Sequence, residues 1–268
     1  MKSKQEETTL KHEIIAGASY GNTFGGRYYM NLDHYQNPLI KYIAETDKDS
    51  YSIVDLGGGS GIVGCSLLKK LLDLGKKGTL DVIDINQRQL EGVNVEARRL
   101  GIPLGLVRTF QKDIITMRTK QYDVTCMRKV LHYFDEQNNI RFIQRLPHFL
   151  RPGGLLIIGS MVGIDSLDSR YKEDILNEIE WFIAKGSNFS SRSILTENKL
   201  RELLSIVGFV NIQETQYSEG ISSKQLQDKF GLCDELMEKL DNKERERLKN
   251  TKEKNPYDWK TKVYSCRK

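Results

Sequence analysis

The stretch that most constrains the fold is VDLGGGSGIVG, residues 54–64. An apolar run, SIVDL, leads into it and has the length and composition of a buried strand. The segment GIVGCSLLKKLLDLG follows with apolar residues at helical spacing and ends at Gly75. Glycines let a chain turn tightly from strand to helix and bring backbone N–H groups close to a ligand. The sequence therefore predicts a strand–turn–helix unit of an α/β protein.

The pattern continues from about residue 38, where short apolar runs alternate with helix-period segments as in a parallel α/β sheet. Thr196 is a candidate N-cap and Gly208 a stop for a late helix. We predict strands at 51–56, 79–85, 104–110, 122–131, 155–162, 210–218 and 259–268. We predict helices at 38–46, 61–75, 87–102, 136–154, 175–186 and 196–208, and further helix within 221–255. Pro152-Gly153-Gly154 is the expected stop of the helix at 136–154.

Composition narrows the class of protein. Of the 268 residues 38% are hydrophobic and 29% charged, which suits a protein with a sizeable core. No run of about 18 apolar residues predicts a membrane span, and the polar start, MKSKQEETTLKHE, lacks the apolar segment of a signal peptide. We expect a cytoplasmic protein. The net charge of +5 is mild, and the basic run at 241–255 is interleaved with acids, which favours a solvated helix face over a nucleic-acid groove.

The cysteines give no sign of a metal or redox site. None of the four forms a C-x-x-C pair, and no His/Cys spacing fits zinc. We expect reduced thiols, two of them in the core, and no bound metal. The four are Cys65, Cys126, Cys233 and Cys266.

The glycine stretch matches two different patterns. Read from Gly59 it is G-S-G-I-V-G, which fits the G-x-G-x-x-G of dinucleotide-binding proteins. Read from Asp55 it is D-L-G-G-G-S-G, which resembles the first motif of S-adenosylmethionine (SAM) methyltransferases. The carboxylate of Asp55 would repel a pyrophosphate, whereas the amine and sulfonium of SAM would attract it. The charge favours SAM, with Asp55, Gly57, Gly59 and Gly61 on its methionine side.

Two further aspartates end or follow predicted strands. Asp84 ends the second strand, where a carboxylate can accept hydrogen bonds from both ribose hydroxyls; the alternative is a helix N-cap. Asp113 follows the third strand and resembles the methyltransferase position that binds the adenine amino group, although Lys112 replaces the usual preceding glycine. Ile85 and Ile114, beside these aspartates, are expected to complete the cofactor pocket.

Taken in order, these acidic strand ends and the final strand pair resemble a class I SAM-dependent methyltransferase over about residues 37–268. The resemblance implies a Rossmann-like, seven-stranded sheet that is mostly parallel, with an antiparallel last strand and helices on both faces. We expect an N-terminal extension over 1–37 and a methyltransferase domain over 38–268. Helical insertions at about 161–190 and 221–255 are expected to shape the acceptor pocket.

The segment MRKVLHYFDEQNNIRF resembles small-molecule O-methyltransferases of the caffeate and hydroxyindole type. Arg128, His132 and Asp135 fall at matching places. The resemblance implies that His132 is the general base that takes a proton from a substrate hydroxyl, and that Arg128 belongs to the cofactor site. A histidine near pKa 6.5 at the carboxyl end of a strand suits that role. The alternative is a structural histidine that caps the following helix.

Two differences from that family concern the partner of His132 and the length of the chain. The family has a glutamate at the end of the fifth strand that orients the histidine, and Ser160 stands at that place here. Asp165 or Glu178 of the following insertion could replace it. The family also carries a large N-terminal dimerisation domain, for which about 50 residues leave no room, so the resemblance covers the catalytic half. A homodimer stays an open expectation.

The N-terminal segment SYGNTFGGRYYMNLDHYQNP suits an ordered loop or lid over a site. Arg27 could bind the methionine carboxylate, and Tyr28 and Tyr29 could line an aromatic pocket. The alternative is that these residues seal the edge of the sheet. His34, in the same segment, is more simply a loop residue.

These observations predict a SAM-dependent methyltransferase that acts on a small-molecule acceptor, at a hydroxyl, with His132 as base. N- or C-methyl transfer by positioning alone and a non-catalytic SAM-binding regulator stay as alternatives. An NAD-dependent oxidoreductase is disfavoured, because no Tyr-x-x-x-Lys stretch follows the fourth strand. No partner of nucleic acid or membrane is expected.

Overall fold

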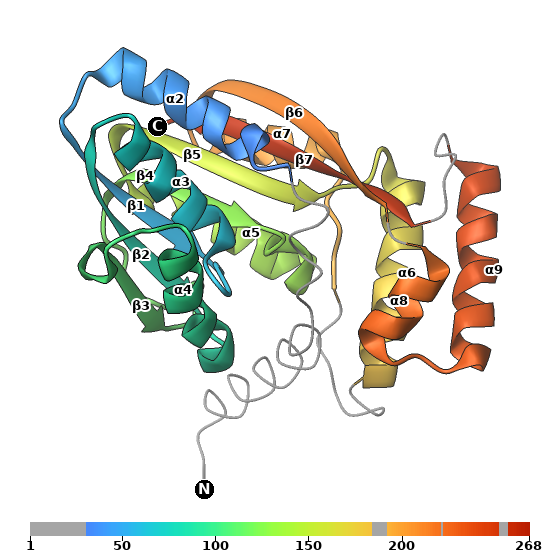
Figure 1. Cartoon of the computed structure of the whole chain (residues 1–268). Coiled ribbons are helices and arrows are strands. Elements are labelled where there is room, and N and C mark those ends of the chain that lie inside the picture. Colours follow the sequence, from blue (N-terminus) through green and yellow to red (C-terminus); the bar gives the residue numbers. More distant parts are fainter. Residues whose placement is uncertain (1–30, 184–191, 221, 252–256) are drawn as a thin grey trace, which may run out of the picture.

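A computed structural model describes residues 31–183, 192–220, 222–251 and 257–268. The strands of these residues form one sheet in the order β3-β2-β1-β4-β5-β7-β6 (Figure 1). The first five pair in parallel, and β7 lies antiparallel between β5 and β6, which confirms the predicted Rossmann-like sheet. The strands are β1 (Ser50–Leu56), β2 (Lys77–Asp84), β3 (Val107–Gln111), β4 (Tyr122–Arg128), β5 (Leu150–Met161), β6 (Val210–Gly220) and β7 (Asp258–Arg267).

Helices cover both faces of the sheet. Helices α2 (Asp33–Thr46), α3 (Ile62–Asp73) and α4 (Gln87–Arg99) bury apolar residues on one face, and α5 (Glu136–Arg145) and α7 (Glu197–Ile206) on the other. Alternate residues of each strand divide between the two cores, as the two-residue period of a strand requires. Ile53 and Ile157 face the first group of helices, and Val54 and Ile158 the second. None of the described helices is long and apolar enough to cross a membrane.

Several predicted boundaries are wrong. Helix α2 begins at Asp33, so residues 33–37 of the predicted extension are helical and His34 stacks on the ring of Tyr217 at 5.3 Å. Helix α5 ends at Arg145, and β5 already begins at Leu150. The predicted helix stop at 152–154 therefore lies within the strand, where Gly153 and Gly154 exchange backbone hydrogen bonds with Lys268. Residues 104–106 form a 3₁₀ turn before β3.

Other local predictions are confirmed. The hydroxyl of Thr196 accepts a hydrogen bond from the Lys199 N–H at 3.1 Å and caps α7. Gly75 and Gly208 follow helices with positive φ angles of 73° and 93°, where glycine avoids the steric cost of a Cβ. The cysteines carry free thiols as predicted, but three of them are buried where two were expected.

Three helices form a separate layer beyond the carboxyl end of β5 and the β6–β7 pair (Figure 1). They are α6 (Ser166–Ile183), α8 (Ser223–Phe230) and α9 (Asp234–Asn250), and we call them the three-helix unit. Helix α6 begins nine residues earlier than predicted. The unit has a hydrophobic core of its own, which includes Ile175, Leu226 and Leu240 and joins the sheet through Met161.

A buried ionic network ties the three-helix unit together. Asp168 of α6 accepts from Lys172 Nζ at 2.7 Å and from the Arg247 guanidinium of α9 at 2.9 Å. Arg247 in turn donates to both carboxylate oxygens of Glu244, which also accepts from the Tyr257 N–H. The Lys172 ammonium also donates a hydrogen bond to the carbonyl of Val162, the residue directly after β5. Because each of these buried charges has hydrogen-bonded partners, the network fixes α6 and α9 to the sheet.

A second buried contact fixes α2 to the end of β5. The hydroxyl of Tyr35 lies so close to Gly159 that a Cβ at that glycine would stand 1.8 Å from it. The same hydroxyl is 3.1 Å from the hydroxyl of Tyr217 on β6. Glycine at position 159 is thus required by the tyrosine that packs against it.

We expect Gly159→Ala to lower the free energy of unfolding by about 1–3 kcal/mol, because an added methyl overpacks a filled core. Urea denaturation measures this. The matched control is Gly105→Ala, where a Cβ would meet nothing within 4 Å. Combining Gly159→Ala with Tyr35→Leu should recover part of the loss; a purely additive double variant would contradict the assigned contact.

Candidate functional site

The glycine turn joins the carboxyl end of β1 to α3. Gly57, Gly59 and Gly61 all have positive φ, between 54° and 74°, which non-glycine residues adopt at a steric cost. Gly57 also lies against Val130, where a Cβ would be 2.5 Å from the valine side chain. At Gly59 the surroundings are open, and the nearest heavy atoms to a Cβ would be polar oxygens of Gln89 and Asp84 at 3.7 and 4.0 Å. The turn is thus closed on the side of β4 and open at Gly59.

The N–H groups of the turn are used within the protein. Gly57 and Gly58 donate to the Ile83 carbonyl at 2.7 and 3.1 Å, and Gly61 donates to the Gly58 carbonyl at 2.8 Å. Gly59 donates to the Asp84 carboxylate at 2.8 Å. A dinucleotide pyrophosphate relies on such N–H groups at a helix N-terminus. Since these glycine donors are already engaged, the turn does not suit a pyrophosphate.

Asp55 lies behind the turn. Its side chain is 1% exposed and accepts a hydrogen bond from the Gly64 N–H in the first turn of α3 at 2.9 Å. Burial raises the pKa of this carboxyl to about 7, although the Gly64 N–H lowers it. The sequence predicts that Asp55 faces the ligand with a fixed negative charge, whereas in the structure its carboxyl is buried against the start of α3. It holds the first turn of α3 from within.

Asp84 is at the open side of the turn. One carboxylate oxygen accepts from Gly59 and the other from the Asn86 N–H at 2.8 Å. Asn86, rather than Asp84, caps α4, because its side chain accepts from the Gln89 N–H. Burial raises the pKa of Asp84, and the backbone donors act against that rise. Each carboxylate oxygen can accept two hydrogen bonds, so half-buried Asp84 keeps acceptor capacity for a ligand.

The loop after β3 lies next to Asp84. The Lys112 N–H donates to the Asp84 carbonyl at 3.0 Å, which brings Asp113 to the same edge of the sheet. Asp113 is half-buried and accepts from the Ile115 N–H at 2.8 Å within its own loop. Ile85 is half-buried, whereas Ile114 is buried in the core beneath α5.

Arg128 and His132 follow along the same edge. Arg128 ends β4, next to β1. Burial raises the pKa values of Asp55 and Tyr35, and the positive charge of Arg128 acts against both rises. His132 lies in a short 3₁₀ turn, Leu131–Tyr133, and is 5% exposed. Asp135 caps α5 by accepting from the Asn138 N–H at 2.7 Å. The alternative role of His132 as a helix cap is therefore wrong.

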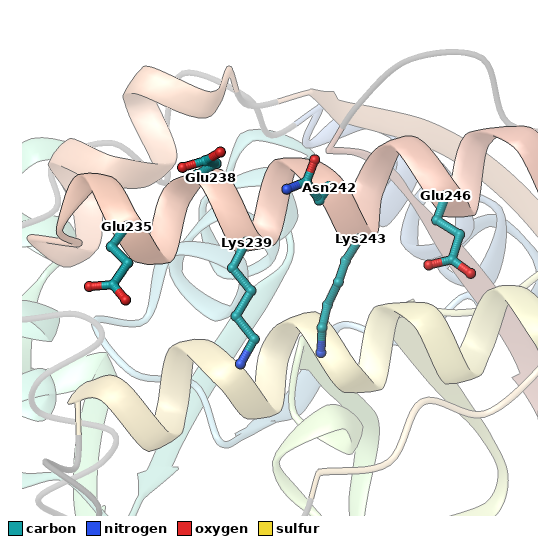
Figure 2. A pocket seen from close by; sticks show the side chains of 6 residues that line it. All are labelled: Glu235, Glu238, Lys239, Asn242, Lys243 and Glu246. Atoms are coloured by element: carbon teal, nitrogen blue, oxygen red, sulfur yellow. The ribbon is translucent and has the colours of Figure 1, made fainter.

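The carboxylates named as substitutes for the family glutamate lie elsewhere. Ser160 is buried in β5 and donates to the Met161 carbonyl at 3.0 Å. Asp165 is exposed at the start of α6 and accepts from the Asp168 N–H. Glu178 accepts from Lys239 and Lys243 of α9 at 2.7 and 3.1 Å. Figure 2 shows both lysines extending from α9 toward α6, along a shallow groove lined by Glu235, Glu238 and other polar residues of α9.

His132 has further contacts that the sequence did not reveal, and they involve the next residue, Tyr133. The ring of Tyr133 lies 4.4 Å from the imidazole between centroids, and the Arg192 guanidinium lies 4.4 Å from the centroid of that tyrosine ring. Arg192 is paired with Glu180 of α6, and both are buried. No spacing in the sequence links His132 to this pair, because Arg192 follows Tyr133 by 59 residues and Glu180 follows His132 by 48.

Other candidates are accounted for more simply. Arg27, Tyr28 and Tyr29 lie outside the described residues. His148 is exposed in the turn before β5. Within the described ranges, no group of three or more His, Cys, Asp or Glu side chains is placed to hold a metal ion.

Residues 54–156, which contain the glycine turn, Asp84, Asp113 and His132, match the family model described as a methyltransferase domain. Together with the strand order and the antiparallel β7, this match decides the class. Residues 54–156 carry a methyltransferase domain, and the described sheet has the fold of class I, SAM-dependent methyltransferases. No curated protein matches the sequence.

Solved structures share this methyltransferase fold at low identity. A proposed methyltransferase from Bacillus halodurans is 14% identical with a TM-score of 0.64, over 85% of this chain and 97% of that one. A 1,6-didemethyltoxoflavin-N1-methyltransferase from Burkholderia thailandensis, solved with that compound and S-adenosylhomocysteine, is 14% identical with a TM-score of 0.55, over 100% and 91%. An O-methyltransferase family protein from the same organism is 13% identical with a TM-score of 0.55, over 97% and 56%.

The raised pKa of Asp55 predicts how stability depends on pH. Between about pH 4 and 7 the folded protein keeps a proton that the unfolded chain has lost, so Asp55 makes stability fall as the pH rises through that window, by up to roughly 1.4 kcal/mol per pH unit. Asp55→Asn should remove this slope and be less destabilising at pH 8 than at pH 5. Urea midpoints of wild type, Asp55→Asn and the exposed-site control Asp49→Asn measure it. A cost of Asp55→Asn that is equal at both pH values would show that Asp55 is ionised throughout.

Proposed function

We propose that this methyltransferase domain transfers the methyl group of SAM to a hydroxyl oxygen of a small molecule, with His132 as the general base. The observation that carries the proposal is the meeting of three elements at one edge of the sheet. They are the closed glycine turn, Asp84 on its open side, and His132 after β4. Ligands of open α/β sheets bind at the carboxyl ends of the strands, near the point where strand order reverses. Here β1 lies at that point, between β2 and β4.

The residues of this edge fit the nucleoside of SAM. Asp84 has acceptor capacity beside the open side of Gly59, and two ribose hydroxyls are donors of the matching kind. We assign Asp84 to the ribose, and Ile85, Asp113 and Ile114 to the adenine side. Bound SAM supplies an electrophilic methyl group on a cationic sulfur.

The methionine side falls at the junction of β1 and β4. Arg128 carries a positive charge there, and we assign it to the methionine carboxylate. Gly57 and Gly61 shape the turn, and Asp55 supports it from behind. Since the glycine N–H groups are engaged, recognition on this side rests on side chains and on the shape of the turn.

His132 supplies the remaining group. Methyl transfer is an in-line displacement that depends mainly on alignment, and a base raises the nucleophilicity of a hydroxyl by taking its proton. An imidazole suits that role at neutral pH. The three-helix unit stands beyond the carboxyl end of β5 and the start of β7, and we assign it to the acceptor side of the site (Figure 1).

Cofactor binding tests the Asp84 assignment. Asp84→Ala should weaken S-adenosylhomocysteine binding by about 10- to 100-fold, because it removes charged hydrogen-bond acceptors. Asp84→Asn, which keeps an acceptor for Gly59, should cost less. Isothermal titration calorimetry measures both. Equal binding by wild type and Asp84→Ala, or thermal stabilisation by NADH but not by SAM, would overturn the cofactor site.

Turnover tests the base. A metabolite extract incubated with methyl-labelled SAM identifies an acceptor, whose transfer rate is then compared in wild type and His132→Gln. We expect kcat to fall by about 10²- to 10⁴-fold with S-adenosylhomocysteine affinity unchanged. An undiminished kcat would mean that His132 is no base, and would favour methyl transfer to nitrogen or carbon by positioning alone.

A further inference from the structure

The side chain that follows His132 lies in a chain of contacts that ends on the three-helix unit. The Tyr133 ring contacts both side chains: its centroid lies 4.4 Å from the imidazole centroid of His132 and 4.4 Å from the guanidinium carbon of Arg192. Arg192 is 7% exposed and pairs with the carboxylate of Glu180, which is 3% exposed. Because both distances meet at one ring centroid, the guanidinium carbon and the imidazole centroid are at most about 8.8 Å apart.

The segment that carries Arg192 is held on both sides. On the α6 side, the Arg192 N–H donates to the Asn177 side chain at 3.0 Å and the Ile194 N–H to Glu173 at 2.7 Å. On the side of the histidine, the Ser193 N–H donates to the Phe134 carbonyl at 2.9 Å. Residues 192–194 therefore connect α6 to the turn that contains His132.

We infer that Arg192 and Glu180 are positioning residues, a buried ion pair that fixes the imidazole of His132 through the ring of Tyr133. The inference rests on the proposed role of His132 as base. The pair takes the place of the glutamate that the resembling family carries at the position of Ser160. It acts from α6 and the segment after it instead of from β5. A guanidinium suits this position because its plane stacks on an aromatic face while its N–H groups hold a carboxylate.

The pair also balances charge around the histidine. Removing Glu180 alone leaves the Arg192 cation uncompensated, which disfavours a protonated imidazole; removing Arg192 alone leaves a carboxylate, which favours it. Variants at these two positions leave unchanged the other charged or titratable side chains on the described elements that meet here. These are Tyr133 and Asp135 beside the histidine, Glu136, Arg141 and Arg145 on α5, Arg128 and Lys129 at the end of β4, and Asp165, Asp168, Arg170, Tyr171, Lys172, Glu173, Asp174 and Glu178 on or beside α6.

The test is an NMR titration of the histidine rings in the full chain. Only four histidines need assignment, and His132→Gln identifies the signal of His132. We compare wild type, Glu180→Gln, Arg192→Gln and the double variant. The matched control is Glu178→Gln, one turn or less away on the same helix but paired with α9. Stabilisation of each variant by S-adenosylhomocysteine shows that it is folded.

We expect the titration midpoint of His132 to move down in Glu180→Gln and up in Arg192→Gln, by about 0.3 pH unit or more each. It should return toward the wild-type value in the double variant and stay unchanged in Glu178→Gln. A purely structural role predicts no such opposition, so midpoints that all coincide, or that move in one direction, overturn the inference.

A single variant that leaves one buried charge unpaired can fail to fold, whereas the double variant avoids that cost. In the double variant we expect the NOEs between the His132 and Tyr133 rings to weaken, because the clamp on the tyrosine is gone. If those NOEs persist at wild-type strength, the pair does not position the histidine. Neither measurement requires turnover, so failure of His132 as a base and failure of the clamp give different results.

Discussion

The hydrogen bond from the Gly64 N–H to the buried carboxyl of Asp55 holds the arrangement on which the site depends. It joins the end of β1 to the first turn of α3 and so sets the curvature of the glycine turn between them. Other N–H groups of the turn donate to the backbone carbonyls of Ile83 and Gly58. The Gly59 N–H donates to a side chain, the carboxylate of Asp84. A loop of this kind presents a shaped surface and an acceptor to its ligand. A phosphate-binding loop, in contrast, presents free donors.

The two halves of the molecule differ in how they are stabilised. The sheet and its helices are held by apolar packing on both faces. The three-helix unit combines a smaller apolar core with buried ion pairs, of which Asp168–Arg247 and Glu180–Arg192 are two. Buried ion pairs depend on geometry more steeply than apolar contacts do, so they favour one arrangement of a unit whose core is small. That arrangement fixes Glu180 and Arg192, the ion pair nearest the candidate base.

The sequence contained enough to predict the order of strands and helices, because apolar periodicity and glycine stops are local. It also contained the positions of Asp84 and His132, since both follow apolar strands whose carboxyl ends must meet. It misplaced the start of α2, because the Tyr- and Asn-rich composition of residues 33–37 suggested a loop while Tyr35 packs over Gly159. It did not show that the Asp55 carboxyl lies buried behind the turn, because a carboxylate beside glycines gives no sign of which side of the turn it occupies. The pairing of Arg192 with Glu180 depends on how α6 packs, which no local pattern encodes.

The network around Asp168 has a consequence for the order of folding. Asp168 and Lys172 are synthesised with β5, but Arg247 is 79 residues later than Asp168 and follows both α8 and most of α9. On a ribosome that makes roughly 5–20 residues per second, Asp168 therefore has Lys172 at once but waits several seconds for Arg247, its second cationic partner. Strands β1 to β4 have all their sheet partners well before that moment, whereas β5 still lacks β7. The contact between α6 and α9 is thus completed late, after strands β1 to β4, which position the glycine turn and Asp84, have been synthesised.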